Sequence, residues 1–134
     1  MINNLDDALR FNQLALNLRG ARQELLASNV ANADTPGYKA RDIDFASALK
    51  QAMSGSTQAL PMTTSSSAHL EGSAGGSVMG APVLYRVPDQ PSADGNTVNM
   101  DVERAQATDN ALHYEVGVSF VVSQFKDMTA VLQP

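Results

Sequence analysis

Apolar residues recur at alternating intervals of three and four near both ends of the chain, which is the spacing of a coiled-coil seam. From about Leu5 to Asn32 no proline interrupts the pattern. Its members there are Phe11, Leu14, Leu18, Ala21, Leu25, Ser28 and Asn32. The C-terminal seam contains Ala107, Ala111, Tyr114, Val118, Val121, Phe125, Met128 and Leu132. The spacing predicts a mainly α fold in which the N- and C-terminal helices pair as an antiparallel coiled coil.

Each predicted helix also carries a second apolar stripe on its back. These stripes contain Leu5, Leu9, Leu16, Ala27 and Val30 in the first helix, and Leu112, Val116, Phe120 and Ala130 in the last. A helix that is apolar on two faces needs neighbours on both. We expect other subunits to cover the surplus surface; the alternative is that the segments between the helices fold over it. Gly117, inside the last helix, indicates either a close helix approach or a tolerated defect.

The segment after the first helix predicts a sharp turn. Pro36 removes a backbone donor and disfavours the helical region for Thr35. Pro36 and Gly37 suit the two central positions of a type II turn, where glycine takes a positive φ at little cost. We therefore expect the helix, within residues 1–33, to end near Asn32 and the chain to turn by Gly37.

The middle of the chain is divided by composition into three further parts. Asp44 is expected to cap a short helix from Phe45 to Met53, which closes a segment of residues 34–53. Residues 54–82 are rich in Ser, Gly, Thr and Ala and are expected to form a flexible linker. Within residues 83–100 the run Val83–Val87 predicts a strand that pairs with Thr97–Met100 in a small β-hairpin.

The last helix is expected to occupy residues 101–134, with Asp101 as its N-cap. Two metal-like patterns precede it. Asp42 and Asp44 form a carboxylate pair without further ligands, and the Asp94–Asp101 loop lacks the terminal bidentate Glu of a calcium loop. We therefore predict no metal site.

Composition limits the classes of function. The 134 residues suffice for one domain, and the formal net charge of −5 disfavours binding to nucleic acid or anionic lipid. With no Cys, disulfides and thiol catalysis are excluded. No apolar run is long enough to span a membrane, and Asp6 and Asp7 do not fit a Sec-type signal peptide. The common nucleotide-binding and hydrolase motifs are absent. We predict no catalytic residues and no cofactor.

A resemblance to a known family becomes visible at this point. The run from Ser28 to Lys39, SNVANADTPGYK, closely resembles the signature near the N-terminus of the axial proteins of the bacterial flagellum, its rod and hook components. Two further runs, ARDIDF (40–45) and YRVPDQPSADGNTV (85–98), resemble the proximal-rod subunits of this family. The resemblance covers about residues 1–53 and 83–134. It implies that Asn29, Asn32, Thr35, Pro36, Gly37 and Tyr38 form a family signature turn.

The resemblance also implies a function. The chain is expected to be a structural subunit of the proximal rod of the basal body, exported through the flagellar type III apparatus without a cleaved signal and assembled helically across the periplasm. Its expected partners are copies of itself, other proximal rod subunits, the rod base adaptor and the MS-ring. We expect the seam residues from Phe11 to Leu25 and from Ala111 to Leu132 to form subunit interfaces.

Two other functions remain open from the sequence. One is a soluble or secreted coiled-coil adaptor or translocator-like protein without a rod role. The other is a small hydrolase that uses Asp42, Asp44 or the two histidines, His69 and His113.

Overall fold

The computed structural model describes residues 2–54, 77–78, 81–88 and 92–132. Two long helices dominate the described chain, and the expected mainly α fold is confirmed. The elements in chain order are α1 (Ile2–Ala31), β1 (Arg41–Ile43), α2 (Phe45–Ser54), β2 (Ser77–Val78), β3 (Ala81–Tyr85) and α3 (Met100–Leu132).

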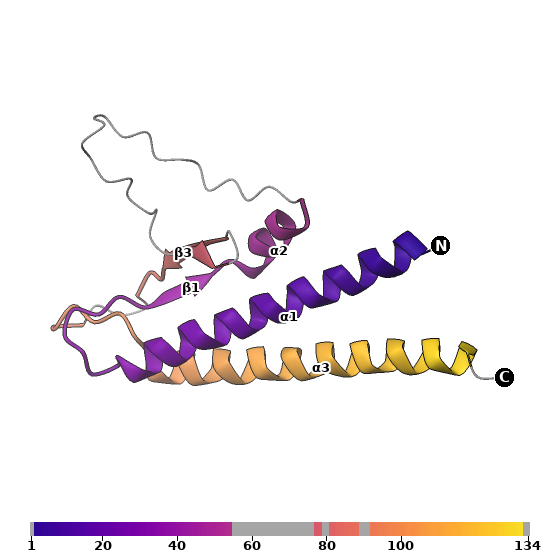
Figure 1. Cartoon of the computed structure of the whole chain (residues 1–134). Coiled ribbons are helices and arrows are strands. Elements are labelled where there is room, and N and C mark those ends of the chain that lie inside the picture. Colours follow the sequence, from indigo (N-terminus) through magenta and orange to yellow (C-terminus); the bar gives the residue numbers. More distant parts are fainter. Residues whose placement is uncertain (1, 55–76, 79–80, 89–91, 133–134) are drawn as a thin grey trace, which may run out of the picture.

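The two long helices lie side by side and run in opposite directions, so that the start of α1 and the end of α3 lie at the same end of the pair (Figure 1). Strand β1 and helix α2 pack against the other side of α1, and β3 packs against both of them. Helix α1 is therefore the middle layer of the molecule. The antiparallel pairing of the terminal helices is confirmed.

Polar side chains at the helix ends set where the helices begin. Asp44 accepts hydrogen bonds from the backbone N–H of Ala46 (3.1 Å) and Ser47 (3.4 Å), so the expected N-cap of α2 is confirmed. The N-cap of α3 was expected at Asp101, but Asn99 takes this role by accepting from the N–H of Asp101 (3.1 Å) and Val102 (3.4 Å). Asn and Asp cap equally well, so the sequence did not distinguish the two positions.

The chain reverses after α1 at the expected turn. Gly37 has a φ of 73°, and the Tyr38 N–H donates to the Thr35 carbonyl at 3.2 Å. This is the geometry that a type II turn with Pro36 at its first central position requires. The predicted turn is confirmed.

The strand pairing differs from the expected hairpin. Strand β3 pairs antiparallel with β1, Arg41 opposite Tyr85, and with β2, Ser77 opposite Pro82. The strand order is β1-β3-β2. The prediction that Thr97–Met100 pairs with Val83–Val87 is wrong, because Thr97 bonds to the turn after α1 and Met100 already belongs to α3. Strand β1 occupies the edge of β3 that this pairing needed.

A small apolar core joins α1 to α2 and the sheet. Its buried members are Leu18, Ile43 and Ala48, and Leu25, Phe45, Leu49 and Val83 pack around them. The Arg19 guanidinium lies over the ring of Phe45, 4.3 Å from its centre. Leu49 and Phe45 lie one turn apart on α2, which explains why both face the same core.

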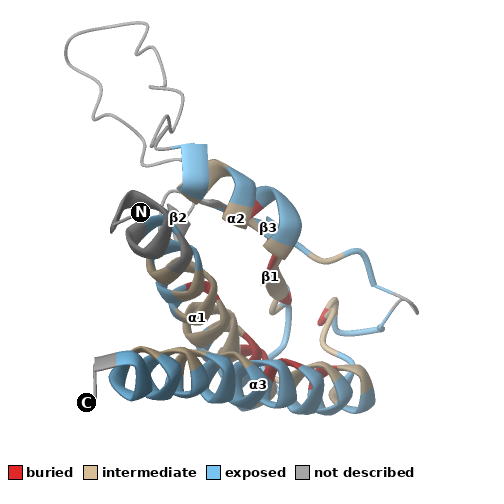
Figure 2. Ribbon diagram, turned by 90° about the vertical axis from the view of Figure 1, so that its right-hand side faces the viewer, coloured by how far each residue is buried: buried red, intermediate tan, exposed pale blue. Residues whose placement is uncertain are grey.

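Burial is uneven along the molecule. Buried residues gather where α1, the sheet and the first turns of α3 meet, whereas most of α3 is exposed (Figure 2). Among the described residues no helix is both long and apolar enough to cross a membrane. The predicted flexible linker lies largely outside the described residues, although Ser77–Val78 and Ala81–Pro82 within its bounds are strand.

Candidate assembly interface and the clamp on the signature turn

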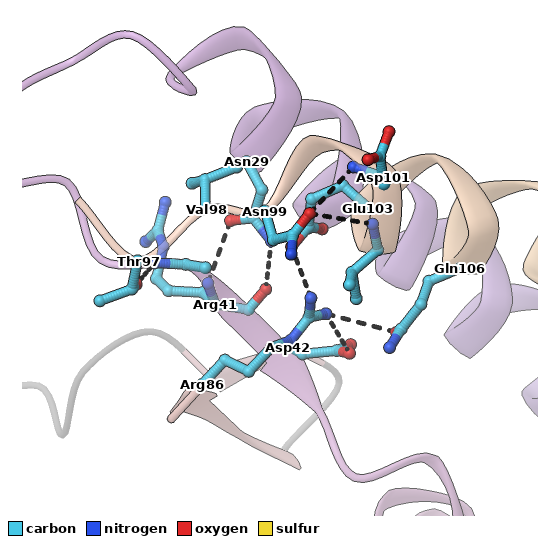
Figure 3. A network of polar contacts seen from close by, with 12 residues as sticks. Asn29, Arg41, Asp42, Arg86, Thr97, Val98, Asn99, Asp101, Glu103 and Gln106 are labelled. Atoms are coloured by element: carbon cyan, nitrogen blue, oxygen red, sulfur yellow. Dashed lines mark hydrogen bonds and ion pairs between the residues drawn. The ribbon is translucent and has the colours of Figure 1, made fainter. Parts of the chain in front are cut away.

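A network of charged side chains holds the sheet to both long helices (Figure 3). Its centre is Asp42 on β1, whose two carboxylate oxygens accept from Arg22 on α1 at 2.8 and 2.9 Å. Arg86, which follows β3, donates to Asp42 at 2.8 Å and also to Glu103 on α3. Glu103 is fully buried, so this ion pair ties the sheet to α3 in a water-poor site.

The charges of the network stabilise one another. Burial by itself raises the pKa of Asp42, but hydrogen bonds from Arg22, the Ile43 N–H and Arg86 outweigh it and hold the pKa below its usual value. The hydrogen bond to Asp42 raises the pKa of Arg22, despite the opposing effect of burial. Both shifts favour the charged pair.

Asn29, a residue of the family signature, connects three elements from α1. It is fully buried. Its amide nitrogen donates to the Arg41 carbonyl (2.8 Å) and to Glu103 (3.2 Å), and its amide oxygen accepts from the Arg41 N–H (3.0 Å). The Tyr38 hydroxyl also donates to this oxygen, at 3.4 Å. Asn29 thus satisfies both backbone groups of Arg41, as a neighbouring strand would.

The end of α1 is capped by a residue from a distant loop. The Asn96 amide nitrogen lies within hydrogen-bond distance of three carbonyl oxygens, those of Asn32 (3.1 Å), Ala33 (2.7 Å) and Thr35 (3.0 Å). The Asn96 oxygen accepts from the Val98 N–H at 2.7 Å. These carbonyls directly follow Ala31, the last residue of α1, so Asn96 holds the first residues of the turn at the end of the helix.

Further hydrogen bonds join the loop that contains Asn96 to the signature turn. The Gly37 N–H donates to the Asp94 carbonyl (2.9 Å), and the Thr97 N–H donates to the Tyr38 carbonyl (3.0 Å). The Thr97 hydroxyl accepts from the Ala40 N–H at 2.8 Å. The loop of residues 92–99 therefore holds the signature turn in place. Within the turn, the Thr35 hydroxyl donates to the side-chain oxygen of Asn32 at 3.2 Å, and Pro36 is exposed.

The predicted N-terminal seam faces the sheet more than it faces α3. Leu18 is buried in the core with α2 and β1, and Leu25 packs against the same core. Leu14 and Ala21 are half-buried, and Phe11 is 40% exposed. The role of these residues in contacts between subunits stays a prediction.

The predicted C-terminal seam lies largely open in the single chain. Val118 and Phe125 are exposed, whereas Val121 and Met128 are half-buried. Ala111 and Tyr114 line a cleft of about 490 Å³ between α3 and α1, together with Gly20 and Ala27. Leu132 is the last residue of α3. This exposed surface, together with the exposed second stripe at Leu112, Val116 and Phe120, is the candidate assembly interface.

Contacts with α1 come instead from another face of α3. Glu103 and Asn110 are buried against α1, Gln124 bonds to Asn12 at 3.2 Å, and Gly117 faces Leu16. A Cβ on Gly117 would lie 2.9 Å from the Leu16 Cδ2. Gly117 thus marks a close helix approach, which settles the choice that the sequence left open.

Sequence reasoning missed the charged network and the residues on this face. Glu103, Asn110, Gly117 and Gln124 are spaced seven residues apart in the sequence. A pattern defined by apolar residues does not include them, because they are polar residues and a glycine. Nothing in the sequence pairs Arg22 with Asp42 or Asn96 with α1, since these partners are 20 and more than 60 residues apart.

The residues of the hydrolase alternative are engaged elsewhere. Asp42 holds two arginines and Asp44 caps α2. His113 is exposed and lies 3.7 Å from Asp109, and His69 is outside the described residues. The described part of the chain contains no cluster of His, Cys, Asp and Glu suited to a metal ion.

Comparisons with known proteins agree with the resemblance seen in the signature turn. A family model described as "Flagella basal body rod protein" matches residues 9–39. The protein named flagellar basal body rod protein FlgB of Salmonella typhimurium strain LT2 is 56% identical over 136 residues, which cover 99% of this chain and 98% of the relative. The proteins of the same name from Escherichia coli K12 and Aeromonas hydrophila are 53% and 40% identical, over 99% and 96% of this chain and 98% and 94% of the relatives. The chain therefore belongs to the FlgB family of flagellar basal body rod proteins and is a structural subunit of the rod.

Proposed function

We propose that the chain is a subunit of the proximal rod that assembles helically with copies of itself and with other rod components, and that it transmits torque without catalysis. Its family is structural. The proposal includes the other proximal rod subunits, the rod base adaptor and the MS-ring as neighbours, with the rod spanning the periplasm.

The main support for assembly with other chains is the exposed apolar surface of α3. Leu112, Val116 and Phe120 follow one another at intervals of four and are 61%, 59% and 54% exposed. Each of these side chains contributes about 1.5–3 kcal/mol when it is fully buried. A surface of this kind along a helix is typical of an interface with other chains.

Torque transmission requires that the subunit does not bend where its layers meet. The Asp42 network joins β1, α1 and α3, and the 92–99 loop fixes the turn after α1. Contacts that link three elements through buried charges resist rotation of one element against another. The sheet and the helix pair would therefore move as one body under load.

The proposal also includes export in an unfolded state through the flagellar type III apparatus, without a cleaved signal. The open face of α3 supports it, because a helix with few buried contacts gains most of its stability only when neighbours cover it. Export would then precede the step at which the helices become firmly ordered.

The test introduces negative charges into the exposed apolar stripe of α3. The double variant Val116→Asp/Phe120→Asp is expressed in a motile bacterium that lacks its own copy of the gene. We expect a folded chain by circular dichroism, loss of swimming, and no rod in isolated basal bodies. The control, Ala46→Asp/Lys50→Asp, places two aspartates four residues apart on exposed positions of α2. Because it also removes the charge of Lys50, its change in net charge is one unit larger, and it should still leave swimming intact. Normal rods built from the α3 variant would refute the proposal.

A further inference from the structure

On the face of α3 that contacts α1, one heptad position is occupied by polar residues and a glycine instead of large apolar residues. Glu103, Asn110, Gly117 and Gln124, spaced seven residues apart, form what we call the polar ladder. Their contacts on α1 run in the opposite order, as an antiparallel pair requires. These contacts are Asn29 for Glu103, Arg19 and Gln23 for Asn110, Leu16 for Gly117, and Asn12 for Gln124.

Stability alone does not explain the ladder. Asn110 is 1% exposed, and its amide nitrogen donates to the Arg19 carbonyl and to the Gln23 side chain, both at 2.9 Å. Its amide oxygen is buried and has no partner among the described residues. A buried polar atom without a hydrogen bond is unfavourable, and the adjacent heptad positions, Ala111, Val118 and Phe125, are apolar and exposed.

The ladder instead satisfies its members in one alignment only. Glu103 meets Asn29 and Arg86 at one end of the helix pair, and Gln124 meets Asn12 towards the other. A slip of one heptad that brings Val131 opposite Asn12 would put Asn110 in the place of Glu103 and leave Arg86 without this buried carboxylate. Losing one partner of a buried ion pair is far more costly than a slip between apolar side chains. Single buried polar residues fix alignment in coiled coils in the same way.

We propose that the polar ladder is a pairing key: it selects the α1 helix of the same chain, in one register, over slipped pairing and over α1 of a second copy. The apolar faces of α3 are indifferent to such choices, because Leu, Val and Phe side chains pack in many alignments. The ladder thereby keeps them free for other contacts. The inference concerns pairing within one chain and stands whether or not the chain builds a rod.

The test uses disulfide reporters in the full chain, which has no cysteine of its own. The pair Asn12→Cys/Gln124→Cys reports the native register, since these two side chains are hydrogen-bonded. The pair Asn12→Cys/Val131→Cys reports a slip of one heptad. Non-reducing electrophoresis after mild oxidation separates each intrachain bridge from disulfide-linked dimers. With Glu103, Asn110 and Gly117 in place, we expect the native bridge to form and the slipped bridge and dimers to be minor.

Each reporter pair is then placed in two ladder variants. The first is Arg86→Met/Glu103→Met/Asn110→Leu, which removes both partners of the ion pair together, and the second is Asn110→Leu alone. We expect the first variant to keep its helical content while the ratio of native to slipped and dimeric bridges falls about tenfold or more, equivalent to about 1.4 kcal/mol. Asn110→Leu should lower the ratio in the same direction without loss of thermal stability.

Ser119→Leu is the control, because it adds the same side chain at an exposed position of α3. Its ratio of bridges should equal that of the chain that carries the reporter cysteines alone. An unchanged ratio in the triple variant would overturn the proposal. If the triple variant does not fold, an unchanged ratio in Asn110→Leu overturns it instead.

Discussion

At the scale of single residues, two asparagines form long-range hydrogen bonds that their neighbours in the sequence do not predict. Asn96 lies 63 residues from Ala33, yet its amide caps the end of α1. Asn29 pairs with both backbone groups of Arg41 and with Glu103. An amide both donates and accepts, so one such side chain can replace a missing strand or helix partner.

Replacing Asn96 with alanine should therefore loosen the turn after α1. The change removes the buried amide that donates to the carbonyls of Asn32, Ala33 and Thr35, and we expect the free energy of unfolding to fall by about 1–3 kcal/mol. Denaturation by urea, followed by circular dichroism, measures it. Asn17→Ala, at an exposed position of α1, is the control and should change stability by less than about 0.5 kcal/mol.

Asp42 makes the stability of the chain dependent on acid. Its pKa in the folded chain lies below the unfolded value of about 3.9. The carboxylate therefore stabilises the fold fully above pH 4, and this contribution is lost as the pH falls through the lower, folded pKa. Asp42→Asn should be less stable than the unmodified chain at pH 7, and the difference should shrink below pH 4. Curves that stay parallel from pH 7 to pH 2 would contradict this account.

At the scale of elements, the helices show that an apolar pattern fixes a helix without fixing its partner. The seam of α1 that contains Leu18 and Leu25 packs on α2 and the sheet, whereas Leu16, from the second stripe, meets α3 at Gly117. Both stripes are apolar, although only the first follows alternating intervals of three and four. Which of them meets α3 depends on where the short middle elements dock.

The close approach at Gly117 gives a prediction at this scale. Gly117→Leu should force α1 and α3 apart and destabilise the chain by about 1–3 kcal/mol, although it improves helix propensity. Gly117→Ala should have a smaller effect, because the Leu16 side chain has a flexible end that can shift. Thermal unfolding of these variants and of Leu16→Ala/Gly117→Leu measures the coupling. The double variant should recover part of the loss; no recovery would argue against a contact at this point.

At the scale of the whole molecule, the buried and the exposed large apolar residues lie in different parts of the fold. Leu18 is buried in the small core, whereas Phe120 is 54% exposed. The molecule therefore has a compact base, where the sheet, α1 and the start of α3 meet, and a long open arm of α3 (Figure 2).

This division predicts opposite outcomes for two aspartate variants. Leu18→Asp should unfold the base, because it buries a carboxylate without a partner, and the loss should be visible by circular dichroism in the isolated chain. Phe120→Asp should leave the spectrum and unfolding temperature of the isolated chain nearly unchanged and weaken incorporation into rods. Equal loss of helical signal in both variants would show that the arm is part of the folding core.

The sequence by itself determined the local features of this protein. The two helices, the N-cap Asp44 and the turn at Pro36–Gly37 all follow from residues that are neighbours in the chain, where periodicity, φ preference and side-chain capping act directly. The family was also indicated by the sequence, because residues 28–39 resemble the signature of the flagellar axial proteins.

Only the tertiary structure decided how these features meet. It placed β1 beside β3, Asn96 at the end of α1, and Arg22 and Arg86 around Asp42. These partners are 20 or more residues apart, and many alternatives with equal local preference compete for each of them. It also placed Glu103, Asn110 and Gln124 against α1 and left Leu112, Val116 and Phe120 exposed. The reason is that the side of α1 facing α3 depends on how α1 docks on the small core, which no local pattern specifies.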